Sequence, residues 1–279
     1  MSVLDRINLF IEIYFRIFRR LKSIKLIAPF IILAFFQGLW LTILVYFYYS
    51  PINKLFSPLL SYFYSEKALH FPYFYYLLPQ LYSYGSLLVL DFIFGIILSA
   101  AAVFMIGADF KQEKGGFAEG FRTAFKSLPA LMIIWIVKTG LIVLFFMYGG
   151  PLIFPLVNDL PMSYFLGFFL VQMIALAISA FLVYAYPAVL LHRMRLFPAI
   201  GESVVLTLRN FVFTFIILFI PWLIQFPIGY ITSTKAYLIL GKFNTTTLIY
   251  LMSANIVISL IANYLLFAGI TYFYLNRTE

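Results

Sequence analysis

The chain has 279 residues, of which 64% are hydrophobic and only 10% are charged. An average soluble domain has about 45–50% apolar and about 25% charged residues, so this chain lacks the charges needed to coat a water-soluble globule. The same composition excludes a disordered chain, a collagen, a coiled coil and a disulfide-rich secreted scaffold. The absence of cysteine excludes thiolate zinc sites and cysteine nucleophiles. We therefore predict an all-α, polytopic membrane protein.

Six apolar runs are long enough to cross a bilayer, since a span needs about 20 mostly apolar residues. Four contain no charged residue, whereas Asp91 interrupts the second run and Lys138 the third. A soluble helical bundle would show polar stripes along these runs, and a β-barrel would show short segments of alternating hydrophobicity. The runs show neither pattern, so we predict transmembrane helices. The six predicted spans are Leu26–Tyr49, Gly85–Ala108, Leu128–Tyr148, Tyr164–Leu191, Phe211–Thr234 and Leu248–Asn276.

The basic residues beside the spans indicate an orientation. The formal net charge is +9, and Lys and Arg gather on the cytoplasmic side of membrane proteins. We therefore predict a multi-pass protein of the cell (plasma) membrane with both termini cytoplasmic, and a first span that acts as an uncleaved anchor. One side holds Arg6, Arg16, Arg19, Arg20, Lys22, Lys25, Lys111, Lys114, Arg122, Lys126, Arg193, Arg195, Arg209 and Arg277; the other holds only Lys54, Lys67, Lys235 and Lys242.

Each cytoplasmic segment before an outward-going span has the pattern of an amphipathic helix. Such helices lie in the membrane interface, with cations near lipid phosphates. We therefore expect three interfacial amphipathic helices and, as partners, the bilayer and its anionic lipid headgroups, with no nucleic acid. The polar stripe of the first is Asp5, Asn8, Glu12, Arg16 and Arg19; the apolar face of the second is Phe117, Phe121, Ala124, Phe125 and Leu128; that of the third is Phe197, Ile200, Val204, Leu208 and Phe211, with Glu202, Ser203 and Asn210 on its other side.

The unit "amphipathic helix, span out, span back" occurs three times in what we expect to be a single integral membrane domain, residues 1–279. The three copies cover residues 1–108, 109–191 and 192–279. A true repeat and a chance alternation of spans and loops both account for this pattern, because side-chain identity between the copies is poor.

The sequence shows no pattern typical of an enzyme or of a cofactor site. The two histidines, His70 and His192, fall on opposite sides of the predicted membrane, so they cannot share a metal. Neither a phosphate-binding glycine-rich loop nor a dinucleotide fingerprint is present. We expect a protein that is not an enzyme and that needs no cofactor.

Polar residues within the spans are the candidate site. Charged groups at membrane depth are expensive, and by default they suggest function. Lys138 lies near the middle of its span and Asp91 nearer the outer end, so the two could pair. Two interpretations stay open: a transport pathway, or a charge-neutralised packing bridge with amides bonding neighbouring helices. The set is Asp91, Lys138, Gln37, Gln172, Gln225, Asn255 and Asn263.

One region resembles a known group of membrane domains. The residues are Tyr186-Pro187-Ala188, then Ala199-Ile200-Gly201-Glu202-Ser203, then Leu208-Arg209-Asn210-Phe211. They resemble the six-helix membrane domain attached to some bacterial glycerophosphodiester phosphodiesterases and its stand-alone relatives, in which a Pro ends a span and a Ser-containing amphipathic helix follows. The helix start differs, with Phe197-Pro198 in place of an alanine-rich sequence. The phosphodiesterase catalytic domain is missing from this chain, so the resemblance implies a layout and not that activity.

Two functions remain as hypotheses. The first, which the lack of catalytic groups favours, is a membrane scaffold that organises lipids or binds a partner. The alternative is a small permease or transport component that uses Asp91 and Lys138.

Overall fold

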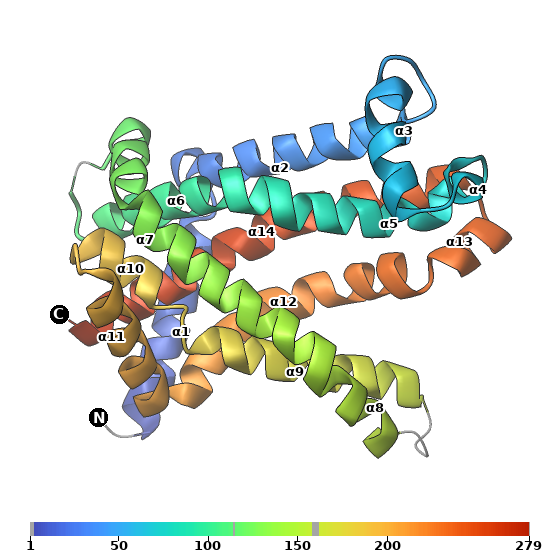
Figure 1. Ribbon diagram of the computed structural model, residues 1–279. Coiled ribbons are helices and arrows are strands. Elements are labelled where there is room, and N and C mark those ends of the chain that lie inside the picture. The colour runs from blue at the N-terminus through green and yellow to red at the C-terminus, as the bar shows by residue number, and fades with distance from the viewer. Residues whose placement is uncertain (1–2, 114, 158–161, 279) are drawn as a thin grey trace. The chain divides into compact units, whose positions relative to one another are not determined.

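The computed structural model describes residues 3–113, 115–157 and 162–278, and every regular element in these ranges is a helix (Figure 1). Six helical stretches of the described chain are long and apolar enough to cross a membrane. Each overlaps one of the six predicted runs, which confirms their number and their helical character. They are Ile24–Val45, Phe74–Phe110, Phe117–Val157, Ser163–Leu191, Phe211–Thr232 and Thr245–Thr278.

Several helices extend well beyond the predicted spans. The aromatic-rich residues before the second span form the helix Phe74–Gly85 and continue into it. The Gly- and Pro-rich stretch after the third predicted span is helical over Gly150–Val157. Pro151 lies inside one continuous helical stretch, Phe117–Val157, directly after the π-helical turn Phe145–Gly149, where the pattern of helical hydrogen bonds changes.

The chain divides into two compact units, and the first contains residues 1–27, 96–220 and 265–279. Its core includes the end of the last long helix, where Tyr272, Phe273 and Tyr274 are all buried. Its helices are α1 (Val3–Arg20), α6 (Ile96–Phe110), α7 (Phe117–Leu144), η2 (Phe145–Gly149), α8 (Gly150–Val157), α9 (Ser163–Ala180), α10 (Ala185–Leu191) and α11 (Leu196–Arg209), with parts of α2 (Ile24–Val45), α12 (Phe211–Thr234) and α14 (Thr245–Thr278).

The second unit contains residues 28–95 and 221–264. Its core is an apolar cluster in which the ring of Phe47 stacks on that of Phe74, with 4.3 Å between centroids. Its helices are α3 (Ile52–Phe63), α4 (Glu66–Leu69), α5 (Phe74–Gly85), the π-helix η1 (Ser86–Gly95) and α13 (Ala236–Lys242), with the remaining parts of α2, α12 and α14. The unit boundaries do not coincide with those of the proposed threefold repeat, and both the single domain and the repeat stay predictions.

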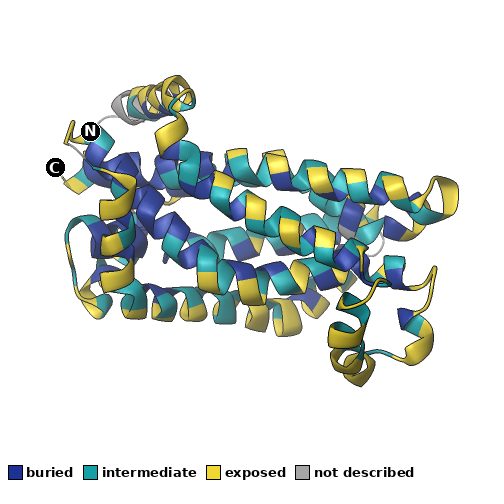
Figure 2. Ribbon diagram, turned by 90° about the horizontal axis from the view of Figure 1, so that it is seen from above, coloured by how far each residue is buried: buried dark blue, intermediate teal, exposed yellow. Residues whose placement is uncertain are grey.

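Small residues allow α7 to approach α6 closely in the first unit. Gly120 and Ala124 of α7 are buried, and a Cβ added at Gly120 would lie 3.0 Å from the carbonyl oxygen of Ala101. The remaining faces of α7 carry many exposed apolar side chains. Figure 2 shows that exposed residues are distributed along the long helices. Close backbone packing through small residues is the usual way in which helices associate within a membrane.

We expect Gly120→Val to lower the free energy of unfolding by about 1–3 kcal/mol, because the added side chain overpacks against a backbone atom that cannot move aside. The measurement is unfolding of the purified protein in mixed micelles, followed by circular dichroism. Gly140→Val is the matched control, since a Cβ at Gly140 on the same helix meets nothing within 4 Å. Equal destabilisation by the two variants would contradict this account of the contact.

The three segments predicted to be amphipathic helices differ from one another. The first is the separate helix α1, which ends at Arg20 before α2 begins at Ile24. The second runs without interruption into the third span as part of α7, so no helix boundary separates them at Leu128. The third is α11, but its packed face is a stripe of small residues, and Ser203 and Asn210 of its polar side are buried.

Candidate functional site

Helix α1 presents three different faces, all described within the first unit. One face packs into the unit through Ile13, Tyr14 and Ile17, each at most 8% exposed. Burial of Tyr14 also raises the pKa of its hydroxyl. The second face is apolar and exposed, and the third is polar and lies beside it around the helix. The exposed apolar residues are Ile7, Ile11, Phe15 and Phe18, and the polar ones include Glu12, Arg16, Arg19 and Arg20.

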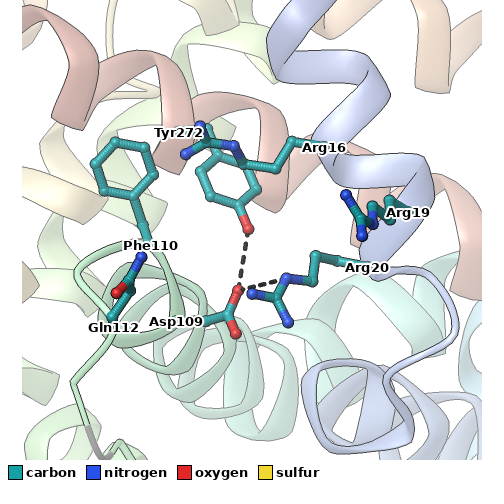
Figure 3. Close-up of a pocket in the computed structure, with 7 residues that line it drawn as sticks. All are labelled: Arg16, Arg19, Arg20, Asp109, Phe110, Gln112 and Tyr272. Carbon is teal, nitrogen blue, oxygen red and sulfur yellow. Dashed lines mark hydrogen bonds and ion pairs between the residues drawn. The ribbon is translucent and has the colours of Figure 1, made fainter.

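The arginines of α1 open into a cavity of about 450 Å³ (Figure 3). The Nε atom of Arg20 lies 3.2 Å from Oδ2 of Asp109, at the end of α6. The hydroxyl of Tyr272, from α14, donates a hydrogen bond of 3.3 Å to the same oxygen. Asp109 is therefore held from two helices, and it fixes the direction of the Arg20 guanidinium. The other lining residues are Arg16, Arg19, Phe110 and Gln112.

Arg16 is oriented by two further contacts. Its guanidinium carbon lies 5.4 Å from the ring centroid of Phe110, within the range of a cation–π interaction. One of its terminal nitrogens lies 3.1 Å from Oε1 of Glu12. Both contacts leave other N–H groups of the guanidinium available to a ligand, because arginine carries five such donors.

The pocket has a surplus of positive charge. Glu12 pairs with Arg16 and Asp109 with Arg20, whereas Arg19 makes no ion pair with any residue that the structure describes. The Arg20 side chain is 49% exposed, so an anion can reach the pocket from solvent. Guanidinium groups bind phosphate and carboxylate oxygens in a bidentate manner. The arrangement is suited to binding one phosphate group.

Sequence reasoning treated these arginines as signs of topology and missed the pocket itself. One signal was available: Asp109 stands in the last turn of α6. A negative charge at a helix C-terminus is unfavourable with respect to the helix dipole, and so indicates a nearby cation. Tyr272 is 163 residues away from Asp109 in sequence, and no local pattern connects the two.

The predicted intramembrane site is distributed between the units. Lys138 and Gln172 belong to the first unit; Asp91, Gln37, Gln225, Asn255 and Asn263 belong to the second. All seven side chains are of intermediate burial. Among the described residues no hydrogen bond joins one of the five amides to another. The assignment of these residues to one site therefore stays a prediction.

The two intramembrane charges have distinct surroundings. Lys138 Nζ lies 6.0 Å from the ring centroid of Tyr186, within the first unit. Asp91 stands in the π-helix η1, beside Gly95, where an added Cβ would lie 3.3 Å from the carboxylate Oδ1. Since the structure describes each charge within its own unit, the pairing of Asp91 with Lys138 stays a prediction.

A second polar cluster lies where α9 ends at Ala180 and α10 begins at Ala185. Ser203 of α11 donates to the carbonyl of Phe181 at 2.8 Å and accepts from the backbone N–H of Tyr184 at 3.1 Å. Thr207 donates to the carbonyl of Ala180 at 2.7 Å. The hydroxyls of α11 thus satisfy backbone groups that the helix break releases, which a membrane environment requires.

A hydrogen-bonded triad lies beside this break. The hydroxyl of Tyr274 donates to Oε1 of Glu202 at 2.7 Å and lies 2.9 Å from Nδ1 of His192. Because the single hydroxyl proton points to Glu202, His192 donates from Nδ1. The triad joins α11 and His192, the residue after α10, to the end of α14. We therefore interpret it as a packing contact of α11 and not as a reactive site.

These observations define the class of the chain: an all-helical protein with six helices apolar and long enough to cross a membrane, and with an arginine-lined pocket in its first unit. Comparison with family models, with curated proteins and with solved structures finds no match. Function is therefore argued from the residues of this chain alone.

Proposed function

We propose that the chain is an integral membrane protein without catalytic activity, which organises lipids by binding the phosphate of an anionic lipid headgroup. The observation that carries this proposal is the pocket of Arg16, Arg19 and Arg20, which opens beside the exposed apolar face of α1. A soluble anion site would not need that apolar face, whereas a lipid offers both an anionic headgroup and acyl chains.

The geometry of α1 supports a position in the membrane interface. Its exposed apolar residues form a stripe next to the arginines, so the helix can lie in the plane of the membrane with Phe15 and Phe18 among the acyl chains. Arg19 and Arg20 then lie at the depth of the lipid phosphates. The excess of basic residues on this side of the spans favours a cytoplasmic location for α1 and for both termini.

One observation favours the second candidate, a small permease. Asp91 lies within a π-helix of ten residues, and π-helical segments are frequently found at functional sites. Under this alternative Asp91 and Lys138 would contact a solute within the membrane, and their neutralisation would abolish uptake without unfolding the protein.

We expect a short-chain phosphatidylglycerol, titrated into the protein in neutral detergent, to raise its unfolding temperature, because a ligand of the folded state stabilises that state. Phosphatidylcholine of the same chain length should have little effect. Arg19→Gln with Arg20→Gln should weaken phosphatidylglycerol binding by about 30-fold, equivalent to about 1 kcal/mol for each arginine. High salt should weaken binding to the wild-type chain.

Arg209→Gln is the matched control, because Arg209 is an exposed arginine at the end of α11 that does not line the pocket. It should bind phosphatidylglycerol as the wild type does. Unchanged binding by the double variant, or equal loss in the Arg209 variant, would contradict a specific pocket.

A further inference from the structure

Helix α3 (Ile52–Phe63), in the second unit, carries apolar residues on two different faces. Of its twelve residues none is buried, although more than half are hydrophobic. In a helical projection at 100° per residue, Phe56 and Leu60 lie on one face and Leu55, Leu59 and Tyr62 on another. Ile52 and Phe63 lie between these two groups, so the apolar side is continuous, and the opposite side is polar, with Asn53, Lys54, Ser57 and Ser61.

The inner face fixes the orientation of α3. Phe56 and Leu60 pack against the apolar core of the second unit. The ring of Phe56 also lies 6.0 Å from that of Trp40 on α2, in an edge-on arrangement. With this face docked, α3 cannot turn its second apolar face inward.

The outer face is strongly exposed. Leu55 is 72%, Leu59 58% and Tyr62 86% exposed. Three large apolar side chains in one stripe, left in water, would be unfavourable, because burial of apolar area is the main stabilising contribution in folding. The short loop before α3 follows the end of the apolar helix α2 at Val45, so α3 begins within seven residues of the boundary of that span.

We infer that α3 is an interfacial helix that inserts Leu55, Leu59 and Tyr62 into the bilayer leaflet reached by the end of α2. Its occupant is lipid, since α3 begins within seven residues of the end of the apolar helix α2 and its polar side carries the cation Lys54, which complements lipid phosphates. Tyr62 has the amphipathic ring typical of this depth. This inference rests on the proposal that the chain spans a membrane.

The chain contains no cysteine, so a single cysteine can carry an environment-sensitive fluorophore at a chosen residue. We would label Leu59→Cys on the outer apolar face, Lys54→Cys on the polar side of the same helix, and Phe35→Cys on α2, where Phe35 is 66% exposed. Each variant is reconstituted into phosphatidylcholine–phosphatidylglycerol vesicles. Quenching is measured with lipids that carry a nitroxide at a shallow or a deep acyl position, and with aqueous iodide.

The expected result is that shallow nitroxides quench the Leu59 label at least twofold more than the Lys54 label, while iodide quenches the Lys54 label more. Deep nitroxides should quench the Phe35 label, whatever the position of α3. If the Phe35 label is quenched but the Leu59 label behaves like the Lys54 label, α3 lies in water and this inference is wrong. If neither quencher reaches the Leu59 label, the face is covered by protein, and the inference is equally wrong. Failure of the Phe35 label to be quenched would instead overturn the proposal of a membrane protein.

Discussion

Ser203→Ala is expected to lower the free energy of unfolding by about 2 kcal/mol, although it removes only one oxygen atom. The hydroxyl of Ser203 is fully buried and serves the carbonyl of Phe181 and the N–H of Tyr184 at once. Without it, two backbone groups at the break between α9 and α10 lose their partners in an apolar environment. The measurement is unfolding in mixed micelles of detergent and denaturing surfactant, followed by circular dichroism.

Two further variants sharpen this prediction. Thr207→Val keeps the side-chain volume but removes the 2.7 Å bond to the carbonyl of Ala180, which then keeps only a long bond of 3.5 Å from the N–H of Val183, and it should cost about 1–2 kcal/mol. Ser179→Ala is the matched control, because Ser179 bonds the carbonyl of Ala175 one turn earlier in its own helix, and that carbonyl keeps its helical partner. A cost below about 0.5 kcal/mol is expected for the control. A similar small cost for Ser203→Ala would show that water reaches the break.

Lys138→Ala is expected to destabilise the protein by about 2.5–3.5 kcal/mol if Lys138 pairs with Asp91, because Asp91 then remains at the predicted membrane depth without this cation. The combined change Asp91→Asn, Lys138→Met should cost less, since both charges are then absent. A double-mutant cycle on Asp91 and Lys138 measures the coupling, and additive single effects would contradict the pair.

Tyr186 provides the comparison for that cycle. Lys138 Nζ lies 6.0 Å from the centre of the Tyr186 ring, so Lys138 could instead depend on this ring alone. Coupling of Lys138 with Tyr186→Leu and none with Asp91→Asn would assign the lysine to packing within the first unit. A neutral double variant that is stable but inactive in solute uptake would favour the permease.

The number of long apolar helices could be predicted from the sequence because hydropathy alone determines it. Their ends could not, because packing against other helices continues a helix beyond the apolar run, even through residues of low helix propensity. Thus α7 begins at Phe117 and not at Leu128, and α5 adds Phe74–Gly85 to the second span. Small residues such as Gly120 and Ala124 occur both in surface helices and in buried ones. They therefore do not indicate where an amphipathic segment ends and a span begins.

Only the basic residues of the pocket could be recognised in the sequence. The basic residues of α1 were apparent as charges, but their partners Asp109 and Tyr272 come from helices distant in sequence. The burial of Ser203 and Asn210 on the polar side of α11 could not be predicted, for a physical reason. In a helix of a soluble protein, Ser203 and Asn210 would face water, whereas here Ser203 bonds backbone groups of a neighbouring break and both are buried.

The break between α9 and α10 also bears on the order in which the chain is assembled. The groups it releases are bonded by residues only 19 to 27 positions later in the sequence. At a synthesis rate of about 5–20 residues per second, α11 follows the break within a few seconds. These backbone groups are therefore bonded before α12 and α14 are synthesised, so α9, α10 and α11 can form a subassembly to which the last two long helices are added.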